Sequence, residues 1–176
     1  MKVMREINSE SKTRGQVIFN LILVLSNWKD NFKPLLVKII LAKSLNFCVR
    51  NKGLKIVGYL MTQKRMVLCI KCGKEDLEKS ISLLREEVRR EIKKRWPEKL
   101  RSEENYLESV TADIFREQLL FNDVLIALIT GGKPGLKCYS PYQAKLGDYI
   151  RNHKFCSAID YTGARGPVIM EWQREA

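Results

Sequence analysis

Tyr149 and His153 are the two side chains of this 176-residue sequence whose types and spacing most directly suggest chemistry. They lie four residues apart, so a helix that begins near Pro141 would place both on one face. A tyrosine hydroxyl can attack phosphorus when a base or a metal assists it, and a side chain one turn away can orient that hydroxyl or hold the metal. The alternative is a partly exposed amphipathic helix with a buried tyrosine ring, and the sequence leaves both interpretations open.

His153 is the only histidine, which excludes any site that needs two imidazoles from one chain. Cys69 and Cys72 form a Cys-x-x-Cys pair at the end of an apolar run, where residues three apart point to opposite faces of a strand. The remaining cysteines are irregularly spaced, and no second pair has metal-ligand spacing. We therefore expect structural free thiols in a reducing compartment, no bound metal and no other cofactor.

The charge is strongly positive, with 32 Lys and Arg against 20 Asp and Glu and a net charge of +12. Residues 1–60 hold 11 basic and 3 acidic side chains, so the excess lies mostly in the first third. Such a field favours a polyanionic partner such as nucleic acid, although a merely solubilising surface would look the same. The sequence shows neither a signal peptide nor an apolar run near the roughly 18 residues of a membrane span, so we expect a cytoplasmic protein without a membrane partner.

Hydrophobic patterning predicts an α+β fold, an antiparallel sheet with helices packed on one side. The apolar run 16–25 predicts a buried strand. The runs 54–61 and 66–72 are separated by four polar residues, which predicts a β-hairpin.

Two long helices are predicted, one over 34–51 that stops at Gly53 and one over 75–96, where apolar residues recur every three or four positions. The polar stretch 98–112 is predicted to be a loop. The apolar stretch 115–130 fits either one helix or a short helix and a strand.

The predicted organisation has three parts. Residues 1–15 form a basic flexible arm, residues 16–156 form one α+β domain, and residues 157–176 form an irregular C-terminal tail held against the domain by Val168, Ile169 and Trp172.

Residues 53–68 resemble the signature hairpin of the single-tyrosine HUH transposases, in which a strand ending in Met-Pro-Asn is followed by His, a hydrophobic residue, His and an apolar strand. The helix at 76–96 matches the next element of that family. Residues 147–152 (GDYIRN) resemble the Asp-Tyr-Ile-x-x-Asn-Pro stretch of its REP-associated branch. The resemblance covers about residues 16–156 and implies a ferredoxin-like or RRM-like sheet.

In that family two histidines hold Mg or Mn at the scissile phosphate, and the tyrosine attacks it to form a 5′-phosphotyrosine. Carried over by position, the histidines become Lys64 and Met66, and the tyrosine becomes Tyr149. A charged lysine has no lone pair and a thioether is too soft for magnesium, while Arg65 between them adds repulsion. His153 supplies at most one ligand, so the resemblance implies a scaffold that has lost its metal pair.

Three hypotheses follow. The first is a degenerate relative that binds single-stranded or hairpin DNA and is not an enzyme, with base stacking on Trp28, Tyr139 or Tyr142 and phosphate contacts from Lys12, Arg14, Lys64, Arg65, Arg85, Arg89 and Lys93. The second is an active DNA strand transferase that uses Tyr149 as nucleophile with help from His153. The third is a non-catalytic protein-interaction module on a reused fold.

Two details of these hypotheses stay open. Arg85, Arg89 and Lys93 also fit a solvated helix face paired with Glu86 and Glu87. The family often works as a homodimer with exchanged tyrosine helices, although REP-associated members can act alone.

Overall fold

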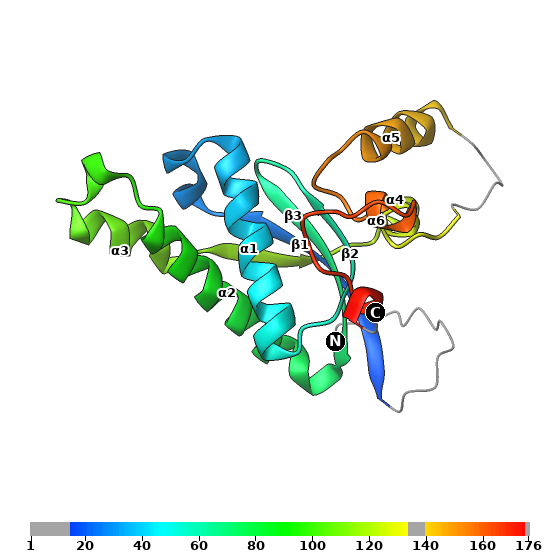
Figure 1. The fold of residues 1–176 in the computed structure, drawn as a ribbon, viewed down its shortest axis with the longest axis horizontal. Helices are drawn as coiled ribbons and strands as arrows, with labels where there is room; N and C mark the ends of the chain where they lie inside the picture. The colour runs from blue at the N-terminus through cyan, green and yellow to red at the C-terminus, as the bar shows by residue number, and fades with distance from the viewer. Residues whose placement is uncertain (1–14, 134–139, 175–176) are drawn as a thin grey trace.

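The computed structural model describes residues 15–133 and 140–174. Four antiparallel strands form one sheet in the order β2-β3-β1-β4 (Figure 1). The strands are β1 (Gln16–Leu25), β2 (Ile56–Met61), β3 (Arg65–Gly73) and β4 (Phe115–Leu119). Helix α1 (Pro34–Lys52) follows β1, and helix α2 (Leu77–Lys94) follows β3. This is the β-α-β-β-α-β order of a ferredoxin-like fold, so the predicted α+β class is confirmed.

Alternation along β1 defines the two faces of the sheet. Phe19, Leu21, Leu23 and Leu25 are at most 5% exposed, and the residues between them are more exposed. Because successive strand residues point to opposite sides, the buried set defines a first face and residues such as Val24 define a second face.

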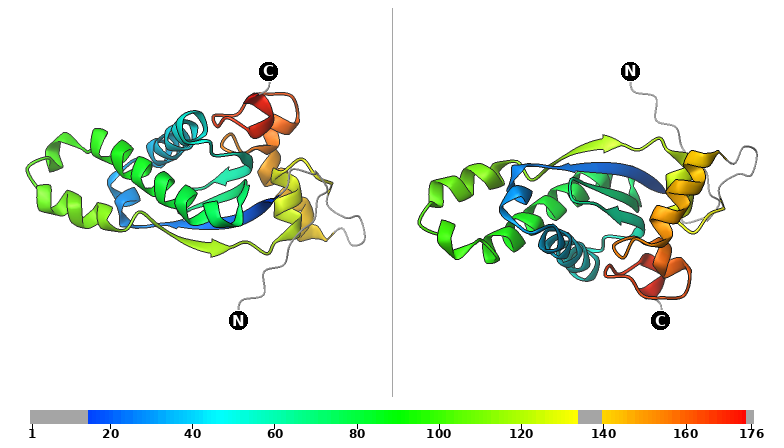
Figure 2. Two further views of the ribbon diagram at one scale, coloured as in Figure 1. Left: turned by 90° about the horizontal axis from the view of Figure 1, so that it is seen from below. Right: turned by 90° about the horizontal axis from the view of Figure 1, so that it is seen from above.

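Helices α1 and α2 pack side by side over the first face, where the main hydrophobic core lies (Figure 2). Gly53 ends α1 with a φ of 74°, as its position predicted. The predicted period of α2 is also confirmed, because Ile81, Leu84, Val88 and Ile92 are all buried. A short 3-10 turn, η2 (Lys74–Asp76), precedes α2.

The second face is partly covered as well, which the expectation of helices on one side missed. The segments that cover it contain helices α4 (Asp123–Ile129), α5 (Pro141–Arg151) and α6 (Ala158–Tyr161). Side chains of these segments and of the strands form a second hydrophobic cluster, which consists of Leu60, Val67, Cys69, Leu120, Ile129, Ile150 and Cys156. The reason is that β2 and β3 carry apolar side chains on both faces.

The structure also revises the expectations for the two stretches 98–112 and 115–130. Residues 98–112 are not a loop, because they contain the 3-10 turn η3 (Glu98–Leu100) and helix α3 (Glu104–Ala112), whose Leu107 and Val110 pack against the core. In the stretch 115–130 the strand β4 comes first and α4 second, with the Asn122 side chain accepting the Leu125 N–H at the start of α4.

The segment 157–170 packs tightly on the sheet. Ser157 is fully buried and accepts the Tyr59 N–H at 2.8 Å, while Asp160 accepts the Gly166 N–H at 2.8 Å. A side chain at Gly166 would collide with the Tyr59 hydroxyl, so this close approach requires glycine.

Val168 is buried as expected, whereas Trp172, in the 3-10 turn η4 (Glu171–Arg174), is 45% exposed. No helix in the described ranges combines the length and the apolar character needed to cross a membrane.

Candidate nucleic-acid interface

A row of three residues crosses the second face of the sheet at one end. Val24 of β1 is paired with Arg65 of β3 on one side and with Arg116 of β4 on the other. Paired residues of antiparallel strands point to the same face, so both arginines share the face of Val24. With neighbouring strands about 4.8 Å apart, the two arginine Cα atoms lie roughly 10 Å apart. We call Arg65, Val24 and Arg116 the arginine row.

Both arginines of this row are exposed, and neither has an ion-pair partner within residues 15–133 and 140–174. Lys71 lies on the same face but is held by Glu171 at 3.3 Å. The next row, toward the middle of the sheet, consists of Val67, Ile22 and Gln118. The second face therefore offers two uncommitted guanidinium groups beside half-buried aliphatic side chains.

The tip of the β2–β3 hairpin adjoins this row. The Thr62 N–H donates to the Arg65 carbonyl at 2.9 Å, and the Thr62 hydroxyl accepts the Arg65 N–H at 3.1 Å, which closes a tight turn. Lys64 lies in this turn and is exposed, and its carbonyl accepts the Leu25 N–H at 3.0 Å. Lys64 and Arg65 thus lie at the hairpin tip, as the sequence predicted.

Met66 points the other way. It is fully buried in the first core, opposite Leu23 and beneath the helices. Lys64 and Met66, the positions to which the family histidines were carried over, therefore do not form a pair on the second face.

Tyr149 and His153 do lie together. Ser140 and Gln143 form a capping box that starts α5, Tyr149 is 49% exposed near its end, and the two rings are 5.1 Å apart. Helix α5 ends at Arg151, so His153 lies just beyond it, and its Nδ1 accepts the Phe155 N–H at 3.3 Å. Burial, followed by the charge of Lys38, lowers the pKa of His153 and so favours the neutral imidazole, whose proton lies on Nε2 because Nδ1 is the acceptor.

The arginines predicted on α2 are held by the protein itself. Arg85 forms an ion pair with Glu117 at 2.8 Å, and Arg89 donates from Nε to the Thr111 carbonyl at 3.0 Å. Lys93 is exposed on the same helix. These three residues belong to the helix over the first face, so the predicted contacts are divided between two sides of the sheet. Lys12 and Arg14 lie outside the described residues.

The residues that were predicted to stack on bases differ in their exposure to solvent. Trp28 is fully buried and donates from Nε1 to the Ile114 carbonyl at 2.7 Å, so its predicted role in base stacking is wrong. Tyr142 is 66% exposed on α5, and Tyr139 lies outside the described residues. Sequence reasoning missed Arg116, because only Phe115 of β4 is buried and the next four residues are exposed, so the pairing with β1 rather than a local pattern places Arg116 beside Val24.

The thiols of the described residues are free and mostly buried. Burial raises the pKa of Cys48 and of Cys69 to about 12, with Glu87 adding to the effect at Cys48, so neither thiol forms a thiolate at neutral pH. The described ranges contain no cluster of three or more His, Cys, Asp or Glu side chains that could hold a metal ion.

Comparisons with protein-family models, curated proteins and solved structures find no match. The likeness to transposases therefore rests on the motif residues alone.

Proposed function

We propose that this protein binds single-stranded DNA through the second face of its sheet, as a transposase-like scaffold without metal-dependent cleavage. The observation that carries the proposal is the arginine row, in which Arg65 and Arg116 flank Val24 without carboxylate partners in the described residues. Guanidinium groups bind phosphate oxygens in a bidentate manner, and uncommitted ones add most to affinity for a polyanion.

The surroundings of the row favour an unpaired strand. Val24 presents half-buried aliphatic surface between the two arginines, and Ile22 presents more in the next row. Bases of a single strand can lie on such apolar surface while phosphates meet the arginines, whereas the bases of a duplex are already stacked.

The chemistry of the hairpin tip supports binding without a metal. Lys64 and Arg65 present positive charge there, and the Met66 thioether is buried on the other face. A divalent cation needs oxygen or imidazole ligands, so this tip favours phosphate over a metal ion.

The variant Arg65→Gln/Arg116→Gln tests the proposal, with Lys99→Gln/Arg165→Gln as a control that removes equal charge from exposed positions elsewhere. We expect affinity for a labelled strand of about 20 nucleotides to fall at least tenfold at about 100 mM salt, and the salt slope to drop by about 1.4 for two lost phosphate contacts. Fluorescence anisotropy measures both. Equal binding by the two variants, or none by the wild type, would refute the proposal.

A second candidate function, DNA strand transfer by Tyr149, is favoured by the neutral His153 ring beside the exposed tyrosine. Tyr149 Oη would form a bond to phosphorus as the bond to the 3′-oxygen breaks, with water taking the phenolic proton and supplying one to the leaving oxygen, while the Nε2–H of His153 orients the tyrosine oxygen.

This activity predicts a denaturation-resistant adduct between the wild-type protein and a labelled single strand. Tyr149→Phe should abolish the adduct, whereas Tyr142→Phe, on the same helix, should retain it. If gel electrophoresis shows no wild-type adduct with or without magnesium or manganese, the strand-transfer function is wrong.

The setting of the protein is part of the proposal. The buried free thiols suit the reducing cytoplasm. Size-exclusion chromatography with light scattering distinguishes a monomer from the homodimer that the family resemblance allows.

A further inference from the structure

Helix α1 has an unusual charge pattern. Its 19 residues contain Lys38, Lys43, Arg50 and Lys52 and no carboxylate. Lys43 and Arg50 are exposed, and neither has an ion-pair partner in the part of the chain that the structure describes. Their charges are therefore not balanced within their own helix.

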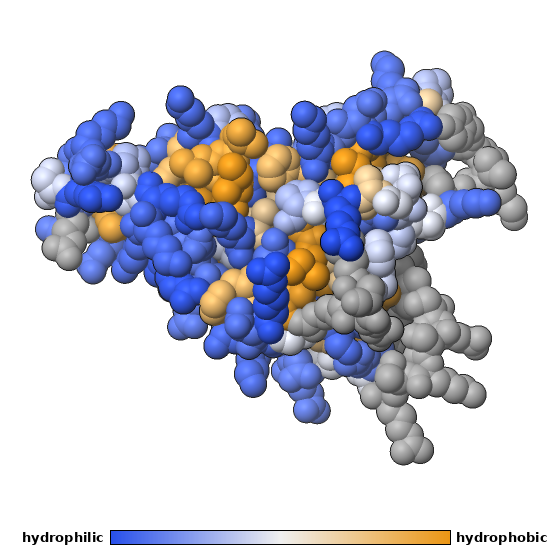
Figure 3. All heavy atoms as spheres, viewed as in Figure 1, coloured by the Kyte–Doolittle hydropathy of each residue, from blue (hydrophilic) through white to orange (hydrophobic). Residues whose placement is uncertain are grey.

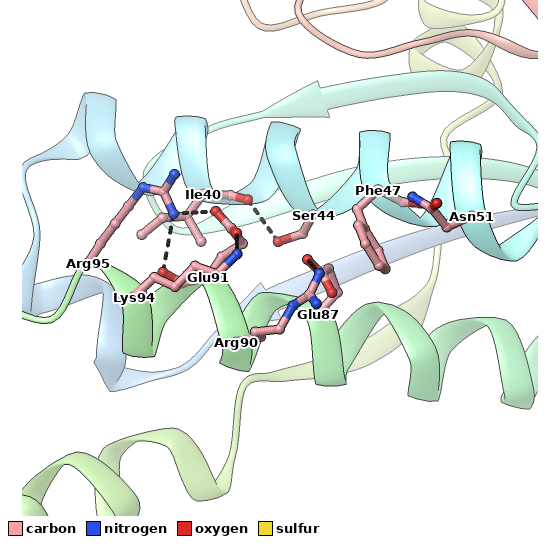
Figure 4. A network of polar contacts seen from close by, with 9 residues as sticks. All are labelled: Ile40, Ser44, Phe47, Asn51, Glu87, Arg90, Glu91, Lys94 and Arg95. Carbon is pink, nitrogen blue, oxygen red and sulfur yellow. Dashed lines mark hydrogen bonds and ion pairs between the residues drawn. The ribbon is translucent and has the colours of Figure 1, made fainter.

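Arg90 of α2 lies close to these cations of α1. The Arg90 guanidinium lies 4.3 Å from the centre of the Phe47 ring, and Phe47 comes four residues after Lys43 and three before Arg50 (Figure 4). Residues three and four apart are neighbours on a helix surface, so the cations of both helices border one surface.

Two buried carboxylates hold part of this surface in place. Glu87 and Glu91 are each 6% exposed, and they bind Arg90 at 2.6 Å and Lys94 at 2.9 Å. Figure 4 shows both carboxylates between the two helices, beside the arginines that pair with them. The positive groups are thus positioned at the surface while the negative groups are withdrawn from it.

We call Lys43, Arg50, Arg90, Lys93 and Lys94 the helical basic face. Lys93 is exposed and has no ion pair among the described residues, and Glu86 is the exposed carboxylate on this side of α2. Hydrophilic side chains cover α2 in this view, whereas apolar surface gathers near the start of α1, where Leu35 is 59% exposed (Figure 3).

We propose that the helical basic face binds the phosphate backbone of a nucleic-acid duplex, on the side of the sheet opposite the arginine row. The class of ligand rests on the proposed function, but the surface and its residues are separate. Lys43 and Arg50 lie about 10 Å apart along α1. Phosphates of a duplex strand follow one another at about 3.4 Å along the axis, so the face spans several of them.

The chemistry of the face favours a duplex over a single strand. Phe47, the aromatic ring at its centre, is covered by Arg90 and cannot stack on a base. Lysines and arginines alone bind phosphates without reading bases, which is how proteins hold a duplex backbone. A hairpin DNA could thus place its stem on α1 and α2 while its unpaired strand lies on the second face.

The variant Lys43→Gln/Arg50→Gln/Lys93→Gln tests this surface without breaking an ion pair of the described residues. Lys99→Gln/Lys133→Gln/Arg165→Gln is the control, since it removes the same charge from other exposed positions. We expect duplex affinity of the first variant to fall at least tenfold at about 100 mM salt, with the salt slope reduced by about 2.7. The control should change less than about twofold, and the first variant should keep single-strand binding within about twofold.

Equal duplex affinity of the two variants would overturn the inference. So would wild-type binding to phosphatidylcholine vesicles containing phosphatidylserine, without binding to the duplex, because the face would then serve a membrane surface. The proposed function fails on a different result, which is that the wild type does not bind the single strand. That result leaves the duplex measurement free to support or overturn the inference about the helical basic face. Circular dichroism melting of each variant confirms folding.

Discussion

Ser157 shows how one small side chain attaches the C-terminal segment to the sheet. Its hydroxyl accepts the Tyr59 N–H at 2.8 Å and lies within hydrogen-bond reach of the Ile129 carbonyl, so it joins β2, the end of α4 and the start of α6. A buried backbone donor that loses its partner retains its desolvation penalty, so the hydroxyl matters more than its size suggests.

Ser157→Ala should therefore lower the free energy of unfolding by about 2–3 kcal/mol. Urea denaturation followed by circular dichroism measures the change. The control is Ser82→Ala on the exposed side of α2, which should change stability by less than about 0.5 kcal/mol. Equal effects of the two substitutions would show that the buried hydroxyl is not needed.

Individual residues also account for the main errors of sequence reasoning. Trp28 resembles an exposed stacking residue because polar residues flank it, but its indole N–H reaches Ile114, 86 positions later in the chain. Arg85 and Arg89 are predicted to contact nucleic acid, a prediction that stays untested, and sequence reasoning did not foresee that Glu117 and Thr111 hold them. All these partners are distant in sequence, so no local pattern indicates them.

At the scale of elements, α2 buries the carboxylates of Glu87 and Glu91 and pairs them with cations of its own last turns. Burial alone would raise the pKa of Glu91, but the hydrogen bond from Lys94 and the charges of Arg95 and Lys94 outweigh it, so the pKa is lowered from its ordinary value of 4.5. A carboxyl group with a lowered pKa in the folded state stabilises that state above its unfolded pKa. This stabilisation is lost as the pH falls through the folded pKa.

Glu91→Gln should consequently lower the free energy of unfolding by about 2–3 kcal/mol near neutral pH. The difference from the wild type should shrink as the pH falls below about 4.5, because wild-type Glu91 then becomes protonated. Urea denaturation over a series of pH values measures it, with Glu86→Gln, an exposed carboxylate, as the control. A difference that stays constant through the acid range would contradict the assigned role of Glu91.

The elements that sequence reasoning placed correctly are those with strong local signals. The period of α2, the glycine that ends α1 and the hairpin all reflect neighbouring residues, and the structure confirms them. Helix α3 was missed because its few apolar residues gain their stability from packing against the core. Strand β4 was left as one of two interpretations of the stretch 115–130, because it is short and carries charged and polar side chains, as sheet edges commonly do.

At the scale of the whole molecule, the two proposed surfaces lie on opposite sides of one sheet. The arginine row belongs to the second face, and the helical basic face belongs to the helices over the first. A net charge of +12 favours a polyanionic partner on either side, and our two proposals assign the binding to the cations without ion-pair partners in the described residues. The two sets of variants should therefore act separately, one on single strands and the other on duplexes.

The sequence by itself determined the basic character of the protein, its α+β class, the hairpin with Lys64 and Arg65 at its tip, and the pairing of Tyr149 with His153. Each of these follows from composition or from residues within a few positions of one another. Only the tertiary structure decided that Arg116 joins Arg65 across Val24, that Met66 faces the core, and that Arg90 lies over Phe47. These contacts depend on strand register and helix packing between distant segments, which local periodicity does not encode.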